Sequence, residues 1–125
     1  MTPNPLILPI LLAAGPVSVG GTPSPAIACR PHTLDRVQRK RQQKLLDLMH
    51  RSAQAREELP EGFAFRLPAE IELFQKAAEW ISLERLCCPF VRFALEWKDD
   101  DTVWVRLEGG PGVKEAIAVE MGFGG

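Results

Sequence analysis

The chain has 125 residues, 46% of them hydrophobic, and its formal net charge is −1. This length predicts one domain with a single core, and the composition is that of an ordinary globular protein. Three cysteines are too few for the disulfide framework of a small secreted protein, so we expect a cytoplasmic protein in a reducing compartment.

The first 32 residues contain seven of the eleven prolines. Because proline removes backbone donors and the accompanying glycines raise the entropic cost of ordering, residues 1–32 are predicted to be a disordered tail. The apolar run 6–14 is too short to span a membrane, and no Lys or Arg precedes it as in a signal peptide. An Ala-Ile-Ala triplet before Cys29 is the one feature typical of export.

A basic amphipathic helix is predicted over residues 33–58, where Thr33 can cap the start and Asp35 lies in the first turn. Its apolar stripe consists of Leu34, Val37, Leu45, Leu48, Met49 and Ala53. Its basic surface carries Arg36, Arg39, Lys40, Arg41, Lys44 and Arg51. No aromatic residue is interleaved with these cations, so we interpret them as a solvated or domain-facing surface and do not expect nucleic acid as a partner.

Residues 59–125 are predicted to form an α+β domain. Apolar alternation indicates a strand over 63–67, preceded by the turn 59–62. A helix follows over 69–88, with Pro68 at its first position and Pro89 ending it. Its buried face is predicted to contain Ile71, Phe74, Ala77, Ala78, Trp80 and Ile81.

A hairpin and a last helix complete the predicted fold. Strands over 91–98 and 103–107 are joined by an acidic turn, and a glycine-rich turn over 109–112 leads to a helix over 113–121. The fold class is therefore α+β: an N-terminal helix followed by β-α-β-β-α, with an antiparallel sheet of strand order 1-3-2 and helices on one face. This arrangement resembles a ferredoxin-like half that lacks its final strand.

The adjacent thiols Cys87 and Cys88 are the most distinctive feature of the chain. On a continuing helix they would point about 100° apart and could not hold one ion together. Pro89 disfavours helical geometry at Cys88, so the second thiol can converge with the first or with a third ligand. Soft thiolates favour zinc, copper(I) and other thiophilic ions, and Cys29 is the candidate third ligand. The alternative is that the cysteines fill the core, as free cysteine commonly does.

Catalysis by an activated thiol ranks below metal binding. The helix C-terminus and Glu84 both raise the pKa of a nearby thiol, whereas Arg85 and Arg92 oppose them. A reactive cysteine prefers a helix N-terminus. We therefore lean against an enzyme. His32 and His50 are interpreted as surface residues.

Three motifs resemble those of a family of small uncharacterised bacterial proteins. One is a Leu-Pro-x-Gly-Phe-x-Phe opening, matched by Leu59, Pro60, Gly62, Phe63 and Phe65. The second is Glu-Arg-x-Cys-Cys-Pro-Phe, matched by Glu84, Arg85, Cys87, Cys88, Pro89 and Phe90. The third is Gly-Pro-x-Gly-x-Lys-Glu, matched by Gly110, Pro111, Gly112, Lys114 and Glu115. The resemblance covers about half of the chain and implies no particular activity.

These observations support three hypotheses. The first is a small cytosolic protein that binds zinc or another thiophilic metal or metalloid through Cys87, Cys88 and Cys29, supported by Glu84, Arg85, Pro89 and Phe90. The second is a non-catalytic interaction module, with Trp97 and Trp104 on an open sheet face that a second copy or another protein covers. The third is a thiol redox enzyme.

Overall fold

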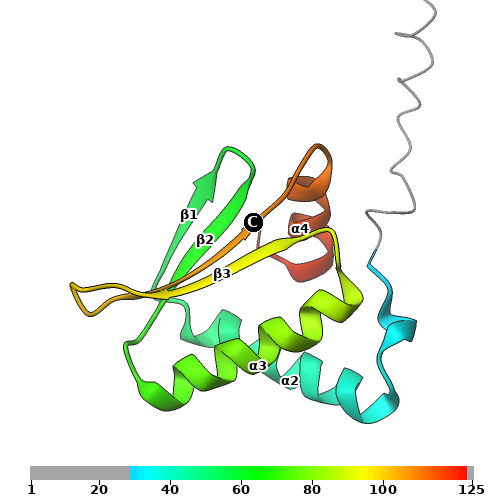
Figure 1. Ribbon diagram of the computed structural model, residues 1–125, viewed down its shortest axis with the longest axis horizontal. Helices are drawn as coiled ribbons and strands as arrows, with labels where there is room; N and C mark the ends of the chain where they lie inside the picture. Colours follow the sequence, from blue (N-terminus) through cyan, green and yellow to red (C-terminus); the bar gives the residue numbers. More distant parts are fainter. Residues whose placement is uncertain (1–28, 124–125) are drawn as a thin grey trace, which may run out of the picture.

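The computed structural model describes residues 29–123. Its helices are α2 (Arg36–Ser52), α3 (Ile71–Cys87) and α4 (Val113–Met121), and the short 3-10 helix η2 (Pro31–Thr33) precedes them. Its strands are β1 (Ala55–Leu59), β2 (Gly62–Leu67), β3 (Arg92–Trp97) and β4 (Val103–Glu108). Figure 1 shows α2 and α3 below the sheet and α4 at the right-hand end of the sheet. The predicted α+β class is confirmed.

The sheet is antiparallel throughout, with strand order β1-β2-β4-β3. The order predicted for the last three strands is therefore confirmed. The prediction of a helix up to residue 58 was wrong, because that helix ends at Ser52 and residues 55–59 form an edge strand. The Arg-Glu-Glu segment of β1 has no apolar alternation, so its strand conformation depends on pairing with β2 across a tight turn.

The N-cap of helix α2 lies two residues later than predicted. Asp35 is the N-cap: its side chain accepts from the backbone N–H of Gln38 at 2.8 Å, and the Gln38 side chain accepts from the backbone N–H of Asp35 at 2.9 Å. Thr33 instead lies in η2. Leu45 and Met49 are buried as predicted, but Val37 is 75% exposed, and the polar Gln42 is buried.

Helix α3 contacts both α2 and strand β3, and Figure 1 shows α2 and α3 on the same side of the sheet. Its buried residues are Leu73, Ala77, Trp80, Glu84 and Cys87. The prediction that Ile71 and Ala78 belong to the buried face was wrong, since both are exposed. Because α3 packs against two neighbours, its buried residues differ from the single apolar face predicted from the sequence. They include an acid, Glu84.

The inner face of the sheet forms the core. Buried Phe65, Val105 and Leu107 face α3 and α4, and Phe123 stacks on Phe65 with ring centroids 4.9 Å apart. His50, predicted to be a surface residue, is half-buried: it stacks on Phe123 with ring centroids 4.4 Å apart, and its Nε2 lies 2.8 Å from the carbonyl oxygen of Met121. His32 is exposed as expected.

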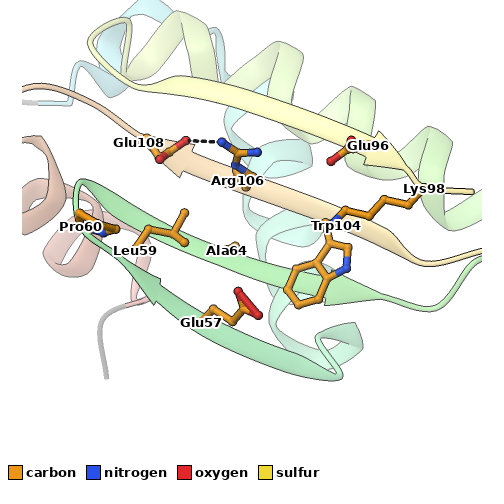
Figure 2. A pocket seen from close by; sticks show the side chains of 9 residues that line it. All are labelled: Glu57, Leu59, Pro60, Ala64, Glu96, Lys98, Trp104, Arg106 and Glu108. Atoms are coloured by element: carbon orange, nitrogen blue, oxygen red, sulfur yellow. Dashed lines mark hydrogen bonds and ion pairs between the residues drawn. The ribbon is translucent and has the colours of Figure 1, made fainter. Parts of the chain in front are cut away.

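The two tryptophans of the hairpin lie on opposite faces of the sheet. Trp97 packs against Phe74 of α3, with ring centroids 5.4 Å apart, so the prediction that it belongs to the open face was wrong. Trp104 is on the open face, under the ammonium group of Lys98. Figure 2 shows the shallow hollow there, which is lined by Glu57, Leu59, Pro60, Ala64, Glu96, Lys98, Trp104, Arg106 and Glu108.

Candidate thiol site

Three sulfur atoms meet at the C-terminal end of α3. The Sγ atoms of Cys29, Cys87 and Cys88 all lie within 4.8 Å of one another. Cys87 is the last residue of α3, and Cys88 is its C-cap with φ −124° and ψ 72°. The prediction that the residue before Pro89 leaves the helix and lets the thiols converge is confirmed, and so is the approach of Cys29.

Cys29 and Cys88 form a disulfide, which the sequence analysis did not predict. Their Cα atoms are 4.7 Å apart although 59 positions separate them in the chain. Cys87 is the remaining free thiol and is 5% exposed. The spacing held no signal for this pair, because disulfide connectivity follows from tertiary contact rather than from sequence distance.

The segment that carries Cys29 is hydrogen-bonded to the end of α3. The backbone N–H of Arg30 donates to the carbonyl oxygen of Cys87 at 2.7 Å. The Thr33 hydroxyl lies 2.9 Å from the carbonyl oxygen of Leu86. Figure 1 shows this segment running beside the C-terminal end of α3. Residues 29–32 are therefore not part of a disordered tail as predicted, whereas the prediction for residues 1–28 lies outside the described residues.

A buried acid lies next to the sulfurs. Glu84 is 3% exposed, and its Oε1 accepts a hydrogen bond from Gln42 Nε2 at 3.0 Å and lies 3.8 Å from Cys88 Sγ. Within residues 29–123, Glu84 Oε2 and the indole nitrogen of Trp80 are buried without a hydrogen-bond partner. Burial raises the pKa of Glu84, and the hydrogen bond from Gln42 opposes that rise.

The surroundings of Cys87 keep its thiol protonated. Burial raises the pKa of Cys87, and the nearby carboxylate of Glu84 raises it further. Hydrogen bonds from Gln42 and from the Arg30 backbone oppose this rise without cancelling it. The direction agrees with the prediction from the sequence that this end of the helix does not activate a thiol.

The other predicted supporting residues lie outside the cluster. Arg85 and Pro89 are exposed and line a shallow surface hollow with Ile81, Val91 and Phe93. Phe90 is half-buried against the core. The burial of Gln42 was not predictable from the sequence, because a glutamine within a basic helix shows no sign that it will be buried beside an acid.

Several charged side chains away from the sulfurs form ion pairs within the described residues. Arg41, part of the predicted basic surface, forms an ion pair with Glu79 of α3 at 2.7 Å. In the hollow of Figure 2, Arg106 donates to Glu108 at 3.2 Å. Lys114, in the first turn of α4 after the glycine-rich turn, donates to Glu58 at 2.6 Å and to the carbonyl oxygen of Leu59 at 2.9 Å. These contacts support the structural interpretations of the basic surface and of the turn.

Comparison with known proteins adds no assignment. The chain matches no protein-family model, and no curated protein or solved structure is significantly similar to it. The resemblance to proteins with a Glu-Arg-x-Cys-Cys-Pro-Phe motif therefore stays a prediction. Within residues 29–123, no helix combines the length and the apolar character needed to cross a membrane.

Proposed function

We propose that the reduced protein binds a soft metal or metalloid ion through the thiolates of Cys29, Cys87 and Cys88. The observation that carries this proposal is the approach of the three sulfurs to within 4.8 Å of one another. Thiolates are the ligands that thiophilic ions select, and a set of three gives far more affinity than an adjacent pair. Cys29 lies 59 positions before Cys88 in the chain, so the meeting of all three sulfurs requires the fold.

Binding by all three sulfurs requires reduction of the disulfide. Two molecules of a cellular monothiol of the glutathione type supply two electrons: their two thiols become one disulfide, and Cys29 and Cys88 each gain a proton. The free Cys87 then completes the set. The oxidised form described here therefore corresponds to the state without an ion, and reduction opens the site.

The site is arranged to survive this reduction. The Arg30 hydrogen bond to Cys87 and the Thr33 contact with Leu86 hold the Cys29 segment on α3 without the covalent bond. Cys87 and Cys88 are anchored by α3 itself, where the N–H of Cys88 donates to the carbonyl oxygen of Glu84 at 2.7 Å. Little reorganisation is then needed when an ion binds, which favours affinity.

The experiment is a titration of the reduced, oxygen-free protein with Cd²⁺, followed by the ultraviolet charge-transfer absorption of cadmium thiolates. We expect one ion per chain, and Cys29→Ser should weaken binding by about 100-fold because one of three thiolates is lost. Leu86→Ala is the matched control: this neighbouring side chain is 40% exposed and should leave the affinity unchanged. A reduced wild-type protein without charge-transfer absorption would refute the proposal.

A thiol redox role is the second candidate, because a free thiol lies beside a disulfide. In that role Cys87 would attack one sulfur of the disulfide and release the other as a thiolate. The raised pKa of Cys87 counts against it, since the attacking species is the thiolate. The reactivity of Cys87 discriminates between the two functions. An interaction role for the open sheet face, a protein partner and a cytoplasmic location remain predictions.

A further inference from the structure

From the number and charge of the donors we infer that the thiol site selects a trivalent metalloid, of the arsenous or antimonous acid class, over divalent zinc. This inference rests on the proposed function and names the class of ion that the three sulfurs hold. It follows from three independent considerations: the donor count, the charge of the filled site and the chemistry by which the ion enters.

The donor count is three. Among residues 29–123, no His, Asp or Glu ligand atom joins Cys29, Cys87 and Cys88 at the same mutual distance. The nearest carboxylate oxygen, Oε1 of Glu84, is 3.8 Å from Cys88 Sγ but already accepts the hydrogen bond from Gln42. A structural zinc site requires four donors in a tetrahedron. A trivalent metalloid forms three single bonds and keeps a lone pair, so three sulfurs satisfy it.

The charge of the filled site points the same way. Three thiolates cancel a trivalent ion, whereas a divalent ion leaves one negative charge in a buried place beside Glu84. Within the described residues, Glu84 has no ion pair, and the polar side chains beside it are those of Gln42, Trp80 and Cys88. Burying a net charge without a partner is costly. The neutral three-thiolate complex avoids that cost.

The entry reaction is balanced without a base or an oxidant. Arsenous acid, As(OH)₃, exchanges its three hydroxyl groups for the three thiols of the reduced protein. Three As–O bonds and three S–H bonds break, three As–S bonds form, and the protons leave in three molecules of water. The oxidation state of arsenic does not change. The preceding reduction of the disulfide by a cellular thiol is the step described above.

The experiment is a competition on the reduced full chain, in which Zn²⁺ and arsenite are offered together at equal concentration. Bound arsenic and zinc are read by native mass spectrometry, and free thiols are counted after rapid removal of unbound ions. We expect one arsenic per chain, loss of all three thiols, and a preference over zinc of about 100-fold or more. The Leu86→Ala control should behave as the wild type.

The possible outcomes separate the two proposals. If Zn²⁺ binds as tightly as arsenite or displaces it, the metalloid inference is overturned while the proposed function stands. If the protein takes up neither ion and also binds no Cd²⁺, both are overturned. Arsenic bound with only two thiols lost would also contradict the inference, because one of the three sulfurs would then be no ligand. This last outcome is checked by Cys29→Ser, which should lower the arsenite affinity by about 100-fold.

Discussion

At the scale of single residues, the chemistry of the site depends on what surrounds Cys87. Its thiol is buried and lies near the carboxylate of Glu84, and both features favour the protonated form. A protonated thiol is a poor nucleophile but can still exchange with a metalloid hydroxyl group. The same residue is therefore suited to binding and poorly suited to redox catalysis.

This environment predicts slow alkylation of Cys87. In the oxidised protein Cys87 is the free thiol, so iodoacetamide reports on it alone. The labelling rate should rise with pH, with its midpoint above that of the same protein unfolded in urea with the disulfide intact. Glu84→Gln removes the charge that raises the pKa and should lower the midpoint. A folded-state midpoint below the unfolded one would favour the redox role instead.

At the scale of elements, the turn between β1 and β2 explains how residues 55–59, which lack apolar alternation, become a strand. Gly62 begins β2 and pairs with Glu108 of β4. A Cβ at this position would lie 2.8 Å from the Cα of Glu108 and would overlap the backbone of Leu107. The close approach of these backbones requires glycine. It also lets β1 add to the edge of the sheet.

We therefore expect Gly62→Ala to lower the free energy of unfolding by about 2 kcal/mol or more, since the clash is with backbone that cannot move aside cheaply. Gly110→Ala is the matched control. Its new methyl group would meet nothing within 4 Å, so stability should change by less than about 0.5 kcal/mol. Urea unfolding measures both variants. Equal stabilities for the two would show that the sheet relaxes around the added methyl group.

At the scale of the whole molecule, the disulfide ties the start of the described chain to the end of the central helix. It closes a loop that spans 59 positions and includes α2, β1, β2 and α3. In the chain-entropy account, a loop of this length stabilises the fold by about 4 kcal/mol. Reduction should therefore open the metal site and weaken the fold together.

The corresponding prediction concerns urea unfolding in three states. Reduction should lower the free energy of unfolding by about 4 kcal/mol. A bound soft ion at a hundred times its dissociation constant should return about 2.7 kcal/mol. Cys29→Ser, which cannot form the bond, should show neither the loss on reduction nor the full recovery. Identical unfolding of the oxidised and reduced wild type would show that this link adds nothing to stability.

Local patterns in the chain were sufficient to predict the last three strands, their order, the acidic turn and the end of α3. In each case the signal lies within a few neighbours: alternation in β4, glycine at the end of α4, and Pro89 after Cys88. For the same reason the divergence of Cys88 from the helix was predictable. Apolar periodicity and the backbone restriction imposed by proline act between residues that are close in the chain, so the local sequence is enough to predict their effects.

Three features depended on contacts with other segments of the chain. Residues 55–59 form a strand because β2 offers an edge, Gln42 is buried because Glu84 faces it, and Cys29 reaches Cys88 across 59 positions. In none of these segments does the local sequence indicate which residues it will contact. The packing of α2 and η2 against α3 brings Gln42 to Glu84 and Cys29 to Cys88, which adds the third sulfur that turns a pair of adjacent thiols into a site.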